Sequence, residues 1–435
     1  MRRITLGVLG LGNVGAGCLR LLDDNRASIE GRLGASLEVR RVLVRDLGRR
    51  REVPTPSGLL TTDAAAILHD PEIDVVVELI GGTEAARSHI LAALRAGKHV
   101  VTANKAVLAE HGAEIFAEAA THGLGVYFEG SVAGGIPLLR SLREGLASDR
   151  IDGLCGIVNG TSNFILDAMT RRGLPYARAL ALAQEAGYAE ADPTLDVSGA
   201  DAAHKLALLT LVSFGLRAAA EAIPTEGITA IDPHDVRAAD RLGYVIKSLA
   251  IARRRGDGVQ LRVHPTLVPR AHVLAGVHGA YNACLVESQA LGRSLYYGRG
   301  AGMMPTAVAV VSDIVEVARV CLSLPGGRLP GGVSPAPAVV PAPLHDLTCE
   351  NYLCVHAPNV PGVLGRVATC LGESGVSIKA MIQDEPDGHE LVPMIMLTEP
   401  CREGALQDAL GRLAAFPDLP RPPRRLRILE TSDDA

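Results

Sequence analysis

The sequence predicts an α/β protein in three parts: a Rossmann-type doubly wound domain over residues 1–137, a central α+β domain over 138–297, and a C-terminal ferredoxin-like module over 348–430. Strand and helix patterns alternate along the first part, which is typical of a parallel sheet with helices on both faces. A Pro/Gly-rich linker over 322–347 precedes a βαββαβ pattern. At 435 residues the chain is long enough for several hydrophobic cores.

The first element is an apolar strand over residues 4–9 that ends in a glycine-rich turn. A helix pattern begins directly behind the turn. This order of strand, turn and helix is the context in which a G-x-G-x-x-G motif binds the pyrophosphate of a dinucleotide. The predicted cofactor-binding residues of the motif are Gly10, Leu11, Gly12, Asn13, Val14 and Gly15.

Each glycine of the motif is expected for a different physical reason. Gly10 permits the tight turn, Gly12 lets a pyrophosphate approach the backbone, and Gly15 allows helix and strand to pack closely. The helix N-terminus offers free N–H groups and a partial positive charge to phosphates. The alternative is an ordinary glycine turn without a ligand.

Further elements continue the alternation to residue 129. The run over residues 75–80 is nearly all apolar, as expected for a strand covered on both faces, and Thr83 can cap the helix behind it. The predicted strands are 37–44, 74–80, 99–103 and 126–129, and the predicted helices are 83–97 and 107–120.

The choice of cofactor depends on the end of the second strand, at Arg45-Asp46. An acidic residue there favours the ribose hydroxyl of NAD, whereas an arginine accommodates the 2′-phosphate of NADP. Both kinds are present, so the sequence allows either cofactor; we favour NADP slightly, with Arg45 as a cofactor-binding residue. The arginines at 49–51 are also consistent with a solvated loop.

The composition argues against several other classes of protein. A net charge of −5 and an aromatic content of 3% give no electrostatic or stacking basis for nucleic-acid binding. No run approaches the ~18 apolar residues of a membrane span, and Asn13 interrupts the N-terminal stretch that resembles a secretory signal. The eight cysteines are scattered, and we interpret them as reduced thiols of a cytoplasmic protein.

The segment over residues 183–205 concentrates ionisable side chains. Asp201 and Lys205 lie four residues apart on a predicted helix and therefore share a face. Apolar residues follow along the helix, so we expect its first turn to face the centre of the molecule, where a lysine beside carboxylates is a candidate proton donor. The alternative, a surface salt bridge worth less than ~0.5 kcal/mol, fits the spacing equally well.

This segment resembles the signature of homoserine dehydrogenases. Other segments agree in order over about residues 4–320: 101–105 resembles the cofactor-side lysine motif, 159–166 the substrate loop, and 298–307 the start of the helix that returns to the nucleotide domain, over 298–321. The matching positions of the segment are Ala183, Gly187, Tyr188, Asp192, Pro193, Asp196, Gly199, Asp201 and Lys205.

The resemblance implies NAD(P)H-dependent, reversible reduction of L-aspartate 4-semialdehyde to L-homoserine, a step in threonine, methionine and isoleucine biosynthesis. It implies that Lys205 protonates the aldehyde oxygen as hydride arrives from the nicotinamide. Asp201 would orient that lysine and, with Glu190, hold the substrate amino group. Lys105 would lie between nicotinamide and substrate. A developing alkoxide needs a cation and a proton, which this set supplies.

The same resemblance completes the two binding sites. Thr161, Tyr188 and Asp196 would finish the substrate pocket, and Gly187 would offer backbone to the cofactor. The return helix would add Gly302 and Thr306 to cofactor binding. The central domain would bind substrate and mediate assembly into a homodimer or homotetramer.

A monovalent cation site, for Na⁺, is also implied by the resemblance. It would consist of Glu129 and the carbonyls of Val132, Gly134 and Ile136. Without the resemblance, an ordinary strand-end carboxylate is the better interpretation of Glu129.

The C-terminal module resembles an ACT domain, whose usual role is to bind an amino acid and to pair with another copy. Residues 359–364 look like its first loop and helix start, and threonine is the usual effector in this family. No aspartokinase-like segment precedes the dehydrogenase part, so we expect a monofunctional chain. The rival interpretations are another amino-acid dehydrogenase of the same build and a catalytically silent sensor; the presence of Lys205 and Asp201 argues against the sensor.

Overall fold

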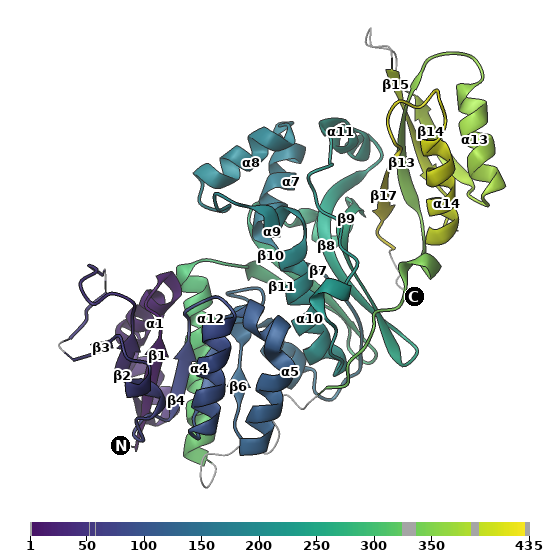
Figure 1. Cartoon of the computed structure of the whole chain (residues 1–435). Helices are drawn as coiled ribbons and strands as arrows, with labels where there is room; N and C mark the ends of the chain where they lie inside the picture. Colours follow the sequence, from purple (N-terminus) through teal and green to yellow (C-terminus); the bar gives the residue numbers. More distant parts are fainter. Residues whose placement is uncertain (1, 52, 57, 324–335, 384–390, 431–435) are drawn as a thin grey trace.

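The computed structural model describes residues 2–51, 53–56, 58–323, 336–383 and 391–430. The N-terminal domain and the C-terminal module lie at opposite ends of the molecule, with the central domain between them (Figure 1). Over these described ranges, no helix is long and apolar enough to cross a membrane.

The N-terminal domain contains a six-stranded parallel sheet in the order β3-β2-β1-β4-β5-β6. The chain crosses from one side of β1 to the other before β4, and ligands of doubly wound sheets bind at such a switch point. Val75, Val76 and Val77 of β4 are fully buried, as predicted for a strand covered on both faces. The strands are β1 (Arg2–Leu9), β2 (Ala35–Leu43), β3 (Leu60–Thr61), β4 (Val75–Glu78), β5 (His99–Thr102) and β6 (Val126–Tyr127).

Helices cover both faces of this sheet. Ile90 of α4 and Ile115 of α5 pack in one core with Val76. Cys18 of α1 and Val310 of α12 belong to the core on the opposite face, so the return helix joins the domain that the first residues form. The helices are α1 (Asn13–Asp24), α2 (Arg26–Leu33), α3 (Ala65–Leu68), α4 (Glu84–Arg95), α5 (Lys105–His122) and α12 (Met303–Ser323).

The central domain contributes five strands in the antiparallel order β11-β10-β7-β8-β9. Leu206, Leu208 and Leu209 of α10 are at most 2% exposed, as the apolar run predicts. The strands are β7 (Ile151–Ile157), β8 (Tyr244–Arg255), β9 (Gly258–Pro269), β10 (Tyr281–Ser288) and β11 (Gly292–Arg299). The helices are α7 (Gly160–Arg172), α8 (Tyr176–Glu185), α9 (Thr194–Val197), α10 (Ala200–Phe214) and α11 (Pro233–Arg241).

The C-terminal module has the predicted βαββαβ order, and its strands lie in the order β17-β13-β15-β14. Strand β17 also pairs with β9 in parallel, so the module and the central domain share one nine-stranded sheet. Buried Tyr352 and Leu426 of the module pack in one core with Ile246 of the central domain. The main elements are β13 (Asn351–Pro358), α13 (Val363–Glu373), β14 (Ile378–Gln383), β15 (Leu391–Thr398), α14 (Glu403–Ala414) and β17 (Arg424–Ile428).

The predicted linker is only partly described, because residues 324–335 lie outside the described ranges. Its second half runs along the central domain: Val339 N donates to the Arg217 carbonyl at 2.8 Å, and Ala342 N donates to the Val259 carbonyl at 3.0 Å. The remaining short elements are η1 (Glu129–Ser131), α6 (Leu138–Arg140), η2 (Ser141–Gly145), η3 (Ala220–Ala222), η4 (Val273–Gly276), η6 (Leu344–Asp346), β12 (Thr348–Cys349) and β16 (Cys401–Arg402).

Candidate active site

The glycine turn between β1 and α1 has the geometry that its sequence predicts. Gly10 has a φ of 103°, and a Cβ there would lie 2.7 Å from the Leu79 carbonyl oxygen. A Cβ at Gly15 would lie 2.5 Å from the Gly10 oxygen, so both positions exclude a side chain. Gly12 stands at the N-cap of α1 without a capping side chain and faces open space. The first N–H groups of α1 are therefore available to an anion.

A cavity of about 500 Å³ adjoins this turn, between the ends of β1, β2 and β4. Arg45, Arg49 and Arg51 are among the residues that line the cavity, and Asp46 also borders it. The Asp46 carboxylate accepts a hydrogen bond from Gly48 N at 2.8 Å, so one of its oxygens already has a partner within the same loop. The cavity therefore combines a glycine turn with three arginines at the switch point of the sheet.

A second cluster centres on the buried carboxylate of Asp201, in the first turn of α10. Its Oδ2 accepts from Lys205 Nζ at 2.7 Å and from Asn159 Nδ2 at 2.7 Å, and its Oδ1 lies 3.1 Å from Lys105 Nζ. Lys205 Nζ also donates to the Val158 carbonyl at 2.8 Å. The three predicted catalytic residues are thus in direct contact, and the surface-salt-bridge alternative is wrong because Asp201 is 6% exposed.

The charges around Asp201 decide its protonation. Burial alone would raise its pKa, but the positive charges of Lys205 and Lys105, with hydrogen bonds from Lys205 and Asn159, hold the pKa well below its ordinary value. Asp201 is therefore ionised at neutral pH and keeps both ammonium groups in place.

Three chain segments bring these groups together at the junction of two domains. Lys105 is the first residue of α5, whose N-cap is Asn104: its Oδ1 accepts from Val107 N at 3.2 Å. Asn159 caps α7 in the same way, accepting from Ser162 N at 2.8 Å, and Lys205 belongs to α10. The nucleotide domain therefore supplies one lysine, and the central domain supplies the other with the shared carboxylate.

Asn159 is the functional residue that sequence reasoning did not single out. Its Nδ2 donates to Asp201 and, at 2.7 Å, to Asp196 Oδ1, so one amide links two carboxylates. The residue lies inside the segment that resembles a substrate loop, and an asparagine before a helix signals an N-cap. No local pattern signals a bridge across 42 residues of chain.

The other predicted substrate residues differ in the contacts that they make near this cluster. Thr161 Oγ1 donates to the Tyr188 carbonyl at 2.6 Å, and the Tyr188 ring lies 4.9 Å from that of Phe164. Glu190 is exposed; the contact given for it is its carbonyl, which accepts from Gln184 Nε2 at 3.2 Å. The described contacts therefore do not bring Glu190 to Asp201.

The predicted cofactor residues outside the glycine turn lie on two other segments. Gly187 is exposed and has a φ of 71°. Gly302 has a φ of 120° just before α12, and its carbonyl accepts from Thr306 N at 3.1 Å. A Cβ at Gly17 of α1 would lie 3.0 Å from Met303, so the start of α12 packs against α1.

Glu129 lies in η1, although the sequence predicts it at the end of a strand, because β6 already ends at Tyr127. Its carboxylate accepts from Leu139 N at 2.9 Å and from Arg140 N at 2.7 Å. The pKa of Glu129 is raised above its ordinary value, because the effect of burial outweighs the lowering effect of these hydrogen bonds. The carboxylate thus occupies the N-terminal end of short helix α6.

The loop after Glu129 presents the other predicted cation ligands. Ala133 has a φ of 53°, and such backbone strain in a residue other than glycine concentrates at functional sites. The Ile136 carbonyl accepts from Leu138 N at 2.7 Å. Carboxylate and carbonyl oxygens retain further lone pairs, and the cation site of Glu129, Val132, Gly134 and Ile136 stays a prediction.

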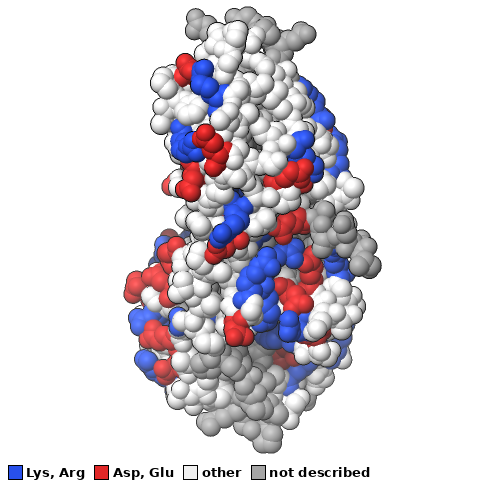
Figure 2. All heavy atoms as spheres, turned by 90° about the vertical axis from the view of Figure 1, so that its right-hand side faces the viewer, with Lys and Arg blue, Asp and Glu red and all other residues white. Residues whose placement is uncertain are grey.

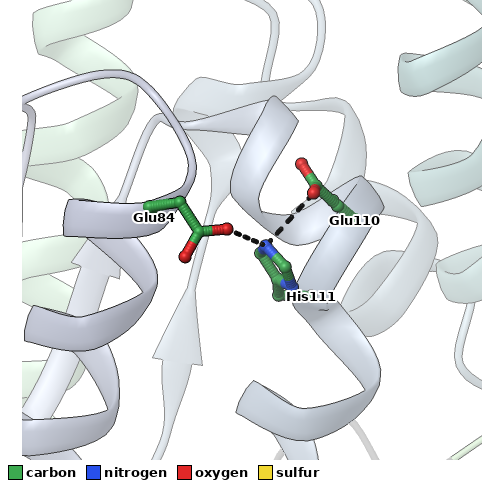
Figure 3. A group of neighbouring side chains, drawn as sticks. All are labelled: Glu84, Glu110 and His111. Carbon is green, nitrogen blue, oxygen red and sulfur yellow. Dashed lines mark ion pairs between the residues drawn. The ribbon is translucent and has the colours of Figure 1, made fainter.

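One cluster of potential metal ligands lies outside the predicted sites, on α4 and α5 (Figure 3). His111 Nε2 lies 3.8 Å from Glu84 Oε1 and 3.4 Å from Glu110 Oε1. Both glutamates are exposed, and exposed acidic groups commonly gather without a metal ion.

The fold and the two clusters define an NAD(P)-dependent oxidoreductase: a Rossmann-type domain supplies the nucleotide cavity, and a lysine–carboxylate group lies at its junction with a second domain. Family models agree, matching "Homoserine dehydrogenase, NAD binding domain" at residues 10–129 and "Homoserine dehydrogenase" at 137–315. The chain belongs to the homoserine dehydrogenase family.

Individual relatives extend this similarity over the whole chain. A homoserine dehydrogenase of Pseudomonas aeruginosa is 45% identical over 432 residues, which cover 98% of this chain and 99% of the relative. The crystal structure of a homoserine dehydrogenase from Thiobacillus denitrificans matches with a TM-score of 0.92 and 44% identity, over 99% of each chain. That of S. aureus homoserine dehydrogenase at pH 7.5 matches with a TM-score of 0.77 and 29% identity, over 99% of this chain and 100% of the other.

Proposed function

We propose that this dehydrogenase reduces L-aspartate 4-semialdehyde to L-homoserine with Lys205 as the proton donor. The observation that carries the proposal is the hydrogen bonding of Lys205 Nζ. An ammonium group has three N–H donors, and two are engaged, by Val158 and Asp201. The third can donate to a substrate oxygen at the junction of the domains.

The nicotinamide, when bound, supplies the hydride that reaches the aldehyde carbon. Lys205 gives its proton to the aldehyde oxygen, so the carbonyl becomes an alcohol and no charge remains on the oxygen. Asp201 holds Lys205 and Lys105 on its two oxygens, and Lys105 adds positive charge near the developing alkoxide. In the reverse direction Lys205 accepts the proton.

Carboxylates around this cluster suit the α-ammonium group of the substrate. We assign the ammonium to Glu190 and Asp201, and the rest of the pocket to Thr161, Tyr188 and Asp196. Asp201 already contacts two lysines, whereas the Glu190 side chain is exposed.

NADP is the proposed preferred cofactor, bound by residues 10–15 with Arg45 at the 2′-phosphate. The three arginines that line the cavity and the hydrogen bond from Gly48 N to Asp46 support this choice. Lys105, Gly187, Gly302 and Thr306 are assigned to the nicotinamide end of the cofactor.

Sodium is the proposed ion for Glu129 and the carbonyls of Val132, Gly134 and Ile136. A Cβ at Gly134 would lie 2.4 Å from the Gly300 oxygen, so an ion in this loop would stabilise the segment that leads into α12. We also propose a cytoplasmic location, which the eight free cysteines support.

The module over residues 348–430 is proposed to be an ACT domain that binds threonine and inhibits the enzyme, as feedback in threonine, methionine and isoleucine biosynthesis. Its βαββαβ order supports this assignment. The proposed assembly is a homodimer or homotetramer, formed through the central domain.

One assay tests the core of the proposal. Oxidation of NADH and of NADPH is followed with L-aspartate 4-semialdehyde, with and without threonine, and the product is identified by chromatography. We expect homoserine to accumulate, NADPH to give the higher kcat/KM, and threonine to slow the reaction. Faster turnover of a different amino-acid aldehyde or ketone would favour the rival dehydrogenase.

A further inference from the structure

Glu78 is an ionisable side chain buried completely inside the nucleotide domain. On the face drawn in Figure 2, acidic and basic side chains lie intermixed at the surface. Glu78, by contrast, is 0% exposed and ends strand β4 at the switch point of the sheet. A buried carboxylate is costly unless hydrogen bonds compensate for the loss of water, so the partners of Glu78 indicate what it does.

One oxygen of Glu78 fixes the loop that follows β4. Its Oε1 accepts from Ile80 N at 2.9 Å. Leu79, Ile80 and Gly81 of this loop line the cofactor cavity. A Cβ at Gly10 would lie 3.1 Å from Ile80 Cα, so the loop packs closely against the glycine turn. A shift of the loop would therefore change the shape of the cofactor cavity.

The other oxygen of Glu78 reaches the start of α5. Its Oε2 accepts from Thr102 Oγ1 at 2.6 Å, and this hydroxyl oxygen accepts in turn from Asn104 N at 3.0 Å. Asn104 is the N-cap of α5, and Lys105 is the first residue of that helix. Two hydrogen bonds thus connect Glu78 to the residue before Lys105.

The side chain of Asn104 returns to the same loop. Its Nδ2 donates to the Gly82 carbonyl at 2.7 Å, while its Oδ1 accepts from Val107 N at 3.2 Å. Gly82 has a φ of 74°, which a residue with a side chain rarely adopts. The loop over residues 79–82 and the first turn of α5 are therefore held to each other twice, through Glu78 and through Asn104.

The groups around Glu78 are hydrogen-bond donors that favour its ionised form. Burial raises the pKa of Glu78 above its ordinary value, and hydrogen bonds to the carboxylate oppose the shift. The donors of these bonds are Thr102, Ile80, Asn104 and Gly81. A glutamine at this position has only one acceptor oxygen, so the Ile80 N–H or the Thr102 hydroxyl would lose its acceptor.

We propose that Glu78 is a positioning residue for the reaction: it holds the cofactor-lining loop and the helix start that presents Lys105 in one fixed arrangement. The inference rests on the proposed function, in which Lys105 lies at the nicotinamide end of the cofactor. Lys105 Nζ lies 3.1 Å from Asp201 Oδ1 of the second domain. The ion pair fixes the tip of this lysine, and the hydrogen bonds from Glu78 to Asn104 fix its backbone.

Glu78→Gln is the first test. The Kd of NADPH or NADH, whichever binds more tightly, is measured by fluorescence titration without substrate, and kcat is measured with L-aspartate 4-semialdehyde. We expect the Kd to rise and kcat to fall, each by about 10-fold, because a hydrogen bond to a charged group is lost. If the native protein does not reduce this aldehyde, the proposed function fails, whereas the Kd still tests Glu78.

Asp74→Asn is the matched control at the opposite end of the same strand. The Asp74 carboxylate, directly before β4, accepts from Thr5 N at 2.8 Å. Its loss should lower the thermal midpoint and leave Kd and kcat close to their native values. If Glu78→Gln likewise lowers only the midpoint, Glu78 is a structural residue and the proposal is wrong.

Thr102→Val separates the two halves of the arrangement. It keeps the shape of the side chain and the bond from Ile80 N to Glu78, but it removes the hydroxyl that leads to Asn104. We expect kcat to fall while the cofactor Kd stays near its native value. Should Glu78→Gln fail to fold, this variant decides, and an unchanged kcat overturns the proposal.

A double-mutant cycle shows whether Glu78 acts through Lys105. In a Lys105→Ala background the positioning of the lysine no longer matters, so Glu78→Gln should lower kcat by less than about 2-fold further. A full 10-fold loss in that background would mean that Glu78 acts by another route.

Discussion

The carboxylate of Asp201 and the ammonium group of Lys205 lie 2.7 Å apart across one turn of α10, and the same carboxylate reaches Lys105 of the other domain at 3.1 Å. Asp201 thus links the substrate domain to the nucleotide domain through its ion pair with Lys105, while Lys205, on the same helix as Asp201, donates a charged hydrogen bond to it. The arrangement places two cations beside one buried anion, which leaves a net positive charge where an alkoxide would develop.

Lys205→Ala should remove most turnover while cofactor binding persists. General acid–base assistance is typically worth ~10²-fold or more, and the cation near the alkoxide is lost as well. Steady-state kinetics across the pH range, with NADPH binding followed by fluorescence, measures both effects. Lys379→Ala, at an exposed lysine paired with Glu350, is the control and should keep full activity. If Lys205→Ala retains more than about half the activity at each pH, Lys205 is a structural lysine.

Asn159→Ser tests the amide that links Asp196 and Asp201. Serine keeps an acceptor for the N-cap of α7, but it cannot bridge the two carboxylates. We expect kcat/KM to fall by about 10-fold or more, because one or two hydrogen bonds to charged groups are lost. The thermal midpoint should stay close to that of the native protein. Unchanged kinetics would show that the lysines need no such positioning.

Arg45→Ala should raise the KM for NADPH much more than the KM for NADH, because only NADPH carries the 2′-phosphate. Arg50→Ala is the matched control, since Arg50 is exposed and is not among the residues that line the cavity. Equal changes for both cofactors would mean that the arginine is solvated and that Asp46 sets the preference.

Asp201→Asn should destabilise the protein in a pH-dependent way. The pKa of Asp201 is depressed in the folded state from an ordinary value of 3.8, so its ionised form stabilises the fold above that value. This contribution is lost as the pH falls through 3.8 toward the folded pKa. Urea unfolding from neutral to acid pH should therefore show a native–variant difference that shrinks only on the acid side. Asp257→Asn, in an exposed turn, should show no such trend.

The sequence predicts the elements whose cause is local. The glycine turn, the buried strand over 75–78 and the amphipathic start of α10 follow from spacing and residue type. The bridge at Asn159 and the pairing of β9 with β17 join residues far apart in the chain, and periodicity carries no information about such partners. Family resemblance assigned roles to Lys105 and Lys205, but only the structure shows that one carboxylate contacts both.

The last prediction concerns a chain from which the C-terminal module is removed. A Pro/Gly-rich linker is typical of separable domains. Here, however, β17 of the module pairs with the edge strand β9 of the central domain. In addition, the Tyr352 hydroxyl donates to the buried Asp235 carboxylate at 3.0 Å. Asp235 also accepts from Arg424 of the module at 3.1 Å.

A fragment ending at Ser323 would expose the edge of β9 and leave Asp235 without these two partners, and unpaired sheet edges promote aggregation. We therefore expect this fragment to have a lower thermal midpoint and to aggregate on size exclusion, although the glycine turn and the lysines are intact. Tyr352→Phe in the full chain isolates one contact and should lower stability by about 1 kcal/mol or more. A soluble fragment with native activity and midpoint would show instead that the module is dispensable for folding, and a threonine titration of that fragment would then locate the effector site.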